Sequence, residues 1–163
     1  MIVKGYACHF NQRNANGEIV TAQSFTDTLK YHSENKIAIP INYNHNADMI
    51  LGHVTDYQLL PDGLFIVAEL NDDVDTVKNF VAPLVKDGTL NRFSTEGLIK
   101  YADLERLSDD TYIAKVFELQ AIAIVNNPAD VGAVISYNGR RTEQTHFFDG
   151  FNAKKNNKML YII

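Results

Sequence analysis

Apolar and polar side chains alternate along residues 37–45, and this alternation predicts a β-strand with one apolar face. The odd-numbered positions carry Ile37, Ile39, Ile41 and Tyr43, and the even-numbered positions carry Ala38, Pro40, Asn42 and Asn44. His45 falls on the apolar side of the pattern. We therefore expect a strand to bring this imidazole to the rim of the core, partly removed from water, where histidine is suited to proton transfer.

Further β-prone runs lie on both sides of this stretch. An opening hairpin is predicted from residues 2–10 and 18–20, because Asn14-Ala15-Asn16-Gly17 is a turn sequence. Residues 51–60 and 64–70 form a second predicted hairpin around Pro61-Asp62-Gly63, and the polar residues 46–48 precede it as a loop. Residues 90–101 predict a strand interrupted by Gly97, and 112–125 predict one long strand that is buried on both faces.

Two segments have helical spacing. Residues 21–33 place Phe25, Leu29 and His32 on one face, with Thr21 or Ser24 available as the N-cap. A second helix follows the acidic cap at residues 71–73 and ends at Gly88, and Pro83 inside it predicts a kink or an early end. These elements predict an α+β fold, a small, mostly antiparallel β-barrel of about seven strands with two or three packed helices.

The pattern breaks down after Gly139. Residues 139–163 carry five Lys and Arg against two acidic residues, whereas the whole 163-residue chain has a formal charge of −5. We therefore divide the chain into a barrel domain, 1–138, and a basic C-terminal tail, 139–163, which is a candidate docking or self-cleaved segment.

Composition narrows the classes of function. With 45% apolar residues the chain can bury a core of its own, and its acidic balance gives no basic surface for nucleic acid. No apolar run is long enough to span a membrane, and the single cysteine, Cys8, excludes an internal disulfide. The histidines and acidic residues lack metal-ligand spacing, and no phosphate-binding glycine loop is present, so we expect no cofactor.

The candidate chemistry is the pair His45 and Ser94, which lie on different predicted strands. A serine hydroxyl is a poor nucleophile until a base within hydrogen-bond distance takes its proton, so the fold would have to bring the two side chains together. A strand serine that only bonds to the backbone has the same sequence signature, so this interpretation stays open.

Several motifs occur in a recognisable order. They are Ile39-Pro40-Ile41-Asn42-Tyr43-Asn44-His45 with Gly52 seven residues on, Asp62-Gly63-Leu64, Leu90-Asn91-Arg92-Phe93-Ser94, and Val125-Asn126-Asn127-Pro128-Ala129. In this order and spacing, residues 3–136 resemble the prohead (procapsid maturation) serine proteases of tailed phages, whose fold is similar to that of herpesvirus assemblin.

The resemblance implies site residues, with two departures. The catalytic histidine falls on His45 and the nucleophile on Ser94, but Glu96 stands where the family usually has glycine. The family's third member, commonly a glutamate, falls on Ala121. Glu118 is the nearest acid and our first candidate for this role, ahead of Glu96 and His53, although its odd offset from position 121 turns it to the other strand face unless a bulge intervenes.

The implied activity is that of a serine endopeptidase that processes scaffold and capsid proteins during phage head maturation. The expected substrates are the phage major capsid protein and the scaffold, and the expected location is the host bacterial cytoplasm, inside the procapsid. We expect a homo-oligomer without nucleic-acid or membrane partners. The alternatives are a non-catalytic capsid-assembly or scaffolding protein with a degenerate protease fold and, more remotely, a small ligand-binding barrel.

Overall fold

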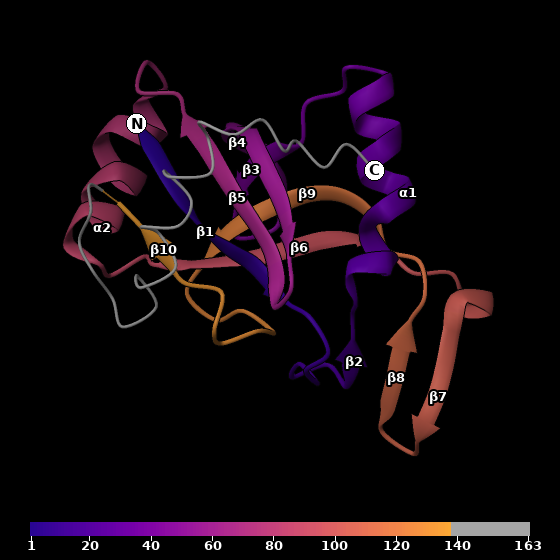
Figure 1. Cartoon of the computed structure of the whole chain (residues 1–163). Helices are drawn as coiled ribbons and strands as arrows, with labels where there is room; N and C mark the ends of the chain where they lie inside the picture. Colours follow the sequence, from indigo (N-terminus) through magenta and orange to yellow (C-terminus); the bar gives the residue numbers. More distant parts are fainter. Residues whose placement is uncertain (138–163) are drawn as a thin grey trace.

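The computed structural model describes residues 1–137 (Figure 1). The domain boundary expected at residue 138 and the basic tail 139–163 lie outside the described residues, so they stay predictions. None of the described helices is long and apolar enough to cross a lipid bilayer.

A curled seven-stranded sheet forms the body of the protein. Its strand order is β10-β1-β5-β4-β3-β9-β6, and every neighbouring pair is antiparallel except β3 with β9. The strands are β1 (Ile2–His9), β3 (Pro40–Tyr43), β4 (Asn46–Leu60), β5 (Gly63–Leu70), β6 (Arg92–Leu98), β9 (Glu118–Val125) and β10 (Ile135–Ser136). An isolated bridge between Arg92 and Val134 brings the two ends of the sheet together, so the sheet curls into a half-barrel. The predicted α+β barrel is confirmed.

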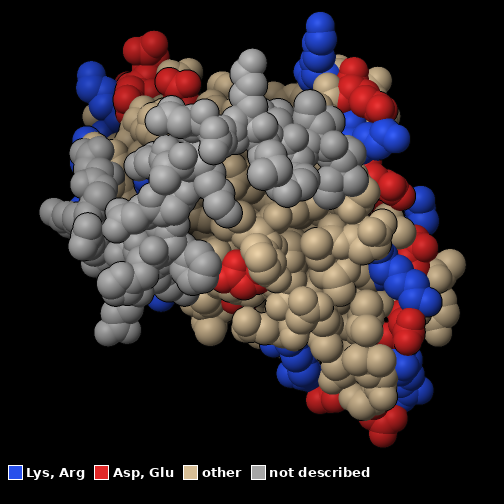
Figure 2. All heavy atoms as spheres, in the orientation of Figure 1, with Lys and Arg blue, Asp and Glu red and all other residues tan. Residues whose placement is uncertain are grey.

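A smaller three-stranded sheet extends from this body, in the order β2-β8-β7. It consists of β2 (Glu18–Ile19), β7 (Leu104–Ser108) and β8 (Thr111–Ala114). Figure 1 shows the β7–β8 hairpin projecting away from the curled sheet, and Figure 2 shows charged side chains of both signs over it. Four of the five residues of β7 are exposed, which explains why the sequence of residues 104–108 has no apolar face.

Two helical segments lie on opposite sides of the sheet in Figure 1. Helix α1 (Ala22–Glu34) begins with a capping box between Thr21 and Ser24, and it buries Phe25 and Leu29, one turn apart. A short 3-10 turn (Tyr101–Asp103) precedes β7.

The second helical segment starts as a π-helical turn (Val77–Val81) and continues as α2 (Ala82–Asp87). It ends at Gly88, which is left-handed with φ 85°, and this end is the one predicted from the sequence. Pro83 was predicted to kink or end the helix. It instead lies in the first turn of α2, where a missing N–H is tolerated, just after the change from π to α geometry.

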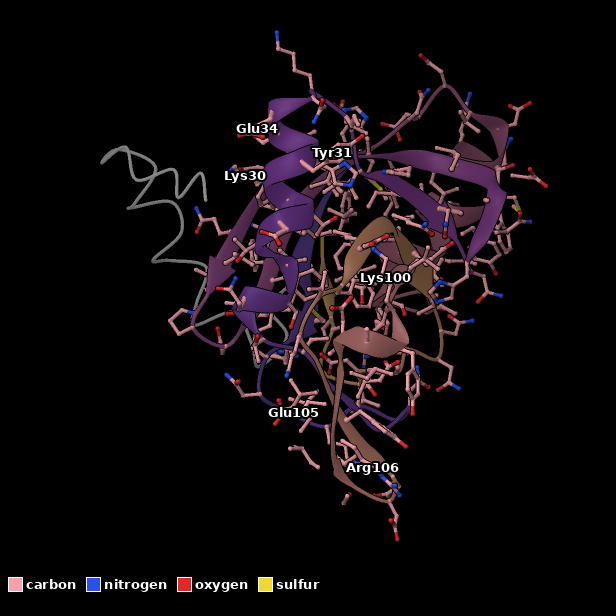
Figure 3. The ribbon with its side chains drawn as sticks, turned by 90° about the vertical axis from the view of Figure 1, so that its right-hand side faces the viewer. Lys30, Tyr31, Glu34, Lys100, Glu105 and Arg106 are labelled. Carbon is pink, nitrogen blue, oxygen red and sulfur yellow. The ribbon has the colours of Figure 1, made fainter. Side chains whose placement is uncertain are left out.

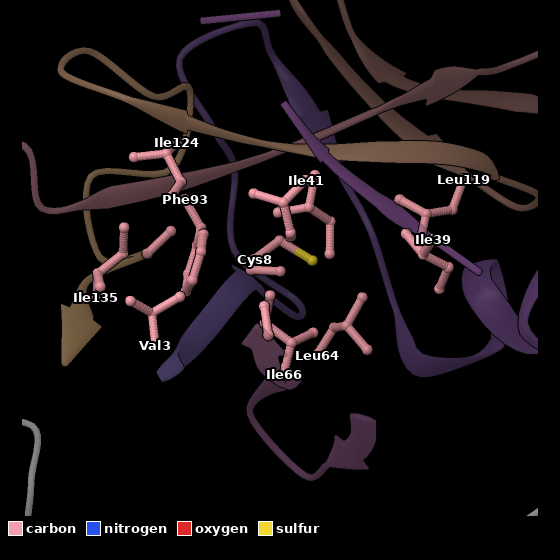
Figure 4. Close-up of a cluster of buried hydrophobic side chains, with 14 of the residues drawn as sticks. Val3, Cys8, Ile39, Ile41, Leu64, Ile66, Phe93, Leu119, Ile124 and Ile135 are labelled. Carbon is pink, nitrogen blue, oxygen red and sulfur yellow. The ribbon is translucent and has the colours of Figure 1, made fainter. Parts of the chain in front are cut away.

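The core lies inside the curl of the sheet. Figure 4 shows buried side chains converging from strands far apart in sequence, among them Val3 of β1, Ile41 of β3, Ile66 of β5 and Phe93 of β6. Phe93 is fully buried and fixes which face of β6 points inward. Its neighbour Ser94 is only partly buried.

Three local predictions were wrong. The segment 18–20 returns antiparallel only to residues 11–13, beyond the end of β1, and its strand β2 pairs in parallel with β8. The run 112–125 is divided between β8 and β9. Between these strands the backbone N–H of Phe117 donates to the Ser24 carbonyl of α1 at 2.8 Å instead of to a neighbouring strand. The polar residues 46–48 belong to β4 rather than to a loop.

Candidate active site

His45 lies on a two-residue turn that joins β3 to β4. Asn44 and His45 have φ values of 52° and 60°, and Tyr43 pairs with Asn46 on either side of them. Two consecutive left-handed residues are the geometry of the tightest hairpin loops, which match the twist of the strands. The strand therefore ends two residues earlier than its apolar alternation predicts, and the imidazole is 43% exposed instead of sitting in the core rim.

Ser94 is the third residue of β6 and pairs with Ala123 of β9. Ser94 and His45 both line one cleft of about 870 Å³, so the fold brings these two predicted residues to the same site. The structure shows no hydrogen bond between the Ser94 hydroxyl and the His45 ring. Contacts of this kind are often long in unliganded enzymes and tighten with substrate.

Glu96 is the acid that contacts His45. Its Oε2 lies 3.3 Å from Nδ1 of the imidazole, and the Glu96 side chain is 29% exposed. The same Oε2 accepts a hydrogen bond of 2.9 Å from Nδ2 of Asn42. A carboxylate accepts hydrogen bonds, so Nδ1 carries the ring proton of a neutral His45 and Nε2 remains available as the base.

The strand register explains how Glu96 reaches this place. Glu96 is paired with Ala121, the position at which the family resemblance implies a glutamate. Residues directly opposite each other on paired strands share a face and lie about 5 Å apart at Cβ. The side chain of Glu96, which comes from the neighbouring strand, therefore occupies the space that a glutamate at position 121 would fill. The small side chain of Ala121 leaves that space open.

The other two candidates lie in different surroundings. Glu118, the first residue of β9, forms an ion pair with Nζ of Lys100 at 2.5 Å and pairs with Leu98 in the β6–β9 ladder. Lys100 is labelled in Figure 3. His53 is an exposed residue of β4, with cross-strand partners Pro40 and Glu69. Of the three acids and bases considered for the third position, the structure brings only Glu96 to His45.

A second polar pair, His9 and Asp130, forms part of the wall of the same cleft. Nδ1 of His9, at the end of β1, lies 2.9 Å from Oδ2 of Asp130, and the same oxygen accepts the backbone N–H of His9 at 2.6 Å. The bond to Asp130 raises the pKa of His9 above its usual value. Burial acts to raise the pKa of Asp130, but the hydrogen bonds from His9 and from the N–H of Gly132 outweigh it, and the pKa is lowered.

Two titratable groups beside this wall are held neutral. Burial raises the pKa of the Cys8 thiol well above its usual range. Burial also raises the pKa of Tyr6, as does the hydrogen bond of 2.8 Å that its hydroxyl donates to Asp62. A thiol of this kind is a poor nucleophile. Within residues 1–137 no three His, Cys, Asp or Glu side chains are grouped as metal ligands.

Sequence reasoning missed Asn42 as a site residue. The sequence analysis placed Asn42 on the polar side of the predicted strand and gave it no role. Asn42 is 1% exposed. A buried polar side chain needs partners, so its presence in an apolar strand is a reason to look for a polar site beside it.

Comparisons with known proteins support the fold and the family. The bacteriophage T4 capsid assembly protease, gp21, matches with a TM-score of 0.66 at 12% identity, covering 78% of this chain and 82% of that chain. The KSHV (Kaposi's sarcoma herpesvirus) protease in complex with a hexapeptide phosphonate inhibitor matches with a TM-score of 0.57 at 11% identity, covering 93% and 76%. At these identities the likeness establishes the fold alone.

Sequence comparisons give two results. No curated protein matches the chain. The family model described as caudovirus prohead serine protease matches residues 1–147, which include the half-barrel and its cleft. The chain belongs to the caudovirus prohead serine protease family.

Proposed function

We propose that the protein is a serine endopeptidase that cleaves scaffold and capsid proteins during phage head maturation, with Ser94 as nucleophile and His45 as base. The observations that carry this proposal are the contact between Nδ1 of His45 and Oε2 of Glu96, and the cleft that His45 and Ser94 both line. Membership of a prohead protease family supports the proposed substrate class. The proposed site of action is the interior of the procapsid in the infected bacterium.

The proposed reaction follows from the placement of the protons. Nε2 of His45 takes the hydroxyl proton of Ser94 as its oxygen attacks the carbonyl carbon of the substrate peptide bond. The imidazolium that forms is stabilised by the Glu96 carboxylate, and it returns the proton to the leaving amine. A water molecule, activated by the same nitrogen, then hydrolyses the acyl-enzyme and restores Ser94.

In this proposal Glu96 replaces Glu118 as the orienting acid. The 3.3 Å contact with His45 supports Glu96, whereas the carboxylate of Glu118 is engaged by Lys100. Glu96 comes from the strand that also carries Ser94, two residues away. Nucleophile and orienting acid therefore move together if β6 shifts, while the base comes from the β3–β4 turn.

The experiment is active-site labelling of the full chain with a serine-reactive phosphonate, followed by peptide mass spectrometry. We expect one adduct, on Ser94, that disappears in Ser94→Ala. It should persist in Ser108→Ala, which removes a serine from β7 of the projecting hairpin. Absence of labelling in the folded, assembled protein would instead favour the non-catalytic capsid-assembly function.

A second measurement addresses the substrates. The protein and its Ser94→Ala variant are each produced together with the scaffold and major capsid protein of the same phage, and the particles are analysed by mass spectrometry. Shortened scaffold and capsid chains in the first sample, and full-length chains in the second, are the expected results. Full-length chains in both samples would contradict the proposed substrates.

A further inference from the structure

Asn42 combines deep burial with incomplete hydrogen bonding. It lies in β3 with 1% of its surface exposed, beside the fully buried Ile41. Its Nδ2 donates to Oε2 of Glu96 at 2.9 Å. Its Oδ1 is the one buried side-chain oxygen or nitrogen without a hydrogen-bond partner in the part of the chain that the structure describes.

The strand register shows how a residue of β3 reaches one of β6. Asn42 is paired with Ala123 of β9, and Ala123 is paired with Ser94 of β6, so these three residues form one row across three strands. In the adjacent row Ala121 faces Glu96. Neighbouring strands lie about 4.8 Å apart, so Asn42 and Glu96 must both extend across β9 to meet. The methyl side chains at 121 and 123 leave the room for this.

A half-satisfied amide at such a position is unfavourable for stability. A buried polar atom without a partner loses its hydrogen bonds to water and forms none in the protein, which costs free energy. An apolar residue of similar size would carry no such desolvation cost. Its chain neighbour Ile41 and its cross-strand partners Ile50 and Ala123 are apolar. A polar residue that lies in an apolar environment and does not stabilise the fold is most often retained for function.

We propose that Asn42 is a positioning residue of the active site, which fixes the Glu96 carboxylate so that it orients His45. This inference rests on the proposed serine peptidase activity. One oxygen, Oε2 of Glu96, receives both Nδ2 of Asn42 and Nδ1 of His45. Glu96 is partly exposed, and without the amide its carboxylate turns toward solvent, leaving the imidazole with neither a fixed tautomer nor a fixed direction.

The test compares Asn42→Leu, which removes the donor and keeps the volume, with the parent protein in a peptide-cleavage assay. We expect kcat to fall roughly 10- to 100-fold, the usual range for losing a hydrogen bond to a charged group, with KM little changed. The thermal midpoint should stay the same or rise, because the unsatisfied oxygen leaves the core. A merely structural Asn42 would give the reverse, a lower midpoint with kcat per folded molecule unchanged.

A double-mutant cycle with Glu96→Gln tests whether Asn42 acts through Glu96. If it does, Asn42→Leu has little further effect on kcat once Glu96 is changed. If the kcat loss of the double variant equals the product of the losses of the two single variants, the proposal is overturned. Should Asn42→Leu fail to fold, Asn42→Ala takes its place: it removes the donor without adding a charge, and it is expected to lower kcat in the same way.

A readout without catalysis separates this proposal from the proposed function. In Ser94→Ala protein, a hydrogen-bonded Nδ1–H of His45 gives a downfield proton NMR signal, assigned by its loss in His45→Gln. We expect Asn42→Leu to abolish or broaden that signal, and an unchanged signal would overturn the role of Asn42. Failure of Ser94 to react with the phosphonate, in contrast, would overturn the peptidase proposal and leave this measurement standing.

Discussion

Glu96→Gln is the substitution that most directly tests the arrangement around His45. Glutamine keeps the size and hydrogen-bonding reach of glutamate but removes its negative charge. The charge matters when the imidazole becomes positive, as it takes the proton of Ser94. The substitution should therefore slow the chemical step and leave substrate binding nearly unchanged.

The magnitude follows from the 3.3 Å separation between Nδ1 of His45 and Oε2 of Glu96. Opposite unit charges at this distance attract by about 5 kcal/mol at an effective dielectric constant of about 20, and by about 1.3 kcal/mol in bulk water. These values correspond to losses of about 5,000-fold and about 10-fold in rate. Both side chains are partly exposed, so solvent screening places the expected loss between the limits, at roughly 100-fold.

The assay is the rate at which a phosphonate modifies Ser94, followed by intact mass, because it needs no knowledge of the cleavage sequence. Glu118→Gln is the matched control: it removes one carboxylate at the ion pair with Lys100 and should leave the labelling rate unchanged. The reasoning is refuted if Glu96→Gln reacts within about twofold of the parent protein, or if Glu118→Gln is slowed as much.

Three further predictions concern stability. A Cβ at Gly52 would lie 1.9 Å from the carbonyl oxygen of Glu69, so Gly52→Ala should lower the free energy of unfolding by about 3 kcal/mol; an unchanged urea midpoint would contradict this. The Oγ of Ser24 accepts the N–H of the N-cap Thr21 at 2.9 Å and donates to the carbonyl of Ala114 at 2.6 Å, so Ser24→Ala should lose about 1–3 kcal/mol in thermal unfolding, and a loss below about 0.5 kcal/mol would argue against that role. The raised pKa of His9 makes its ion pair with Asp130 fully stabilising below about pH 6.5 and weaker as the pH rises through the folded-state pKa. The lowered pKa of Asp130 makes the same pair stabilising above about pH 4 and weaker as the pH falls through its folded-state pKa. The unfolding free-energy difference between the parent and Asp130→Asn should therefore be largest near pH 5, and a difference that does not vary from pH 5 to pH 8 would rule out this linkage.

The strands of the body could be predicted from sequence because each carries a strong local signal. Period-two alternation marked β3, and the Pro61-Asp62-Gly63 turn marked the hairpin of β4 and β5. Thr21 and Ser24 marked the start of α1, and Gly88 marked the end of α2, whereas the acidic residues 71–73 do not cap the second helical segment, whose N-cap position is Thr76. Partner choice between strands has no such signal, which is why the pairing of β2 with β8 was missed.

Only part of the site could be predicted, because strand pairing also decides which acid contacts His45. The positions of His45 and Ser94 follow from sequence motifs, but the third residue depends on cross-strand register. From sequence, Glu118 was preferred because it is the acid nearest to position 121 along the chain. The pairing of Glu96 with Ala121, together with the bulge that follows it, decides which acid reaches the imidazole. Neither is visible in a single sequence.

The two-residue turn that carries His45 limits how this hairpin can vary. Both of its residues are left-handed, and β4 continues the ladder at once with Asn46. One inserted residue would change the turn geometry, redirect the imidazole and displace β4 by one position against β3, turning its buried side chains outward. The β7–β8 hairpin projects from the curled sheet (Figure 1) and is bound by β2 and Arg13 rather than by the strands that carry His45 and Ser94, so changes in its length are expected to leave the chemistry of the site undisturbed.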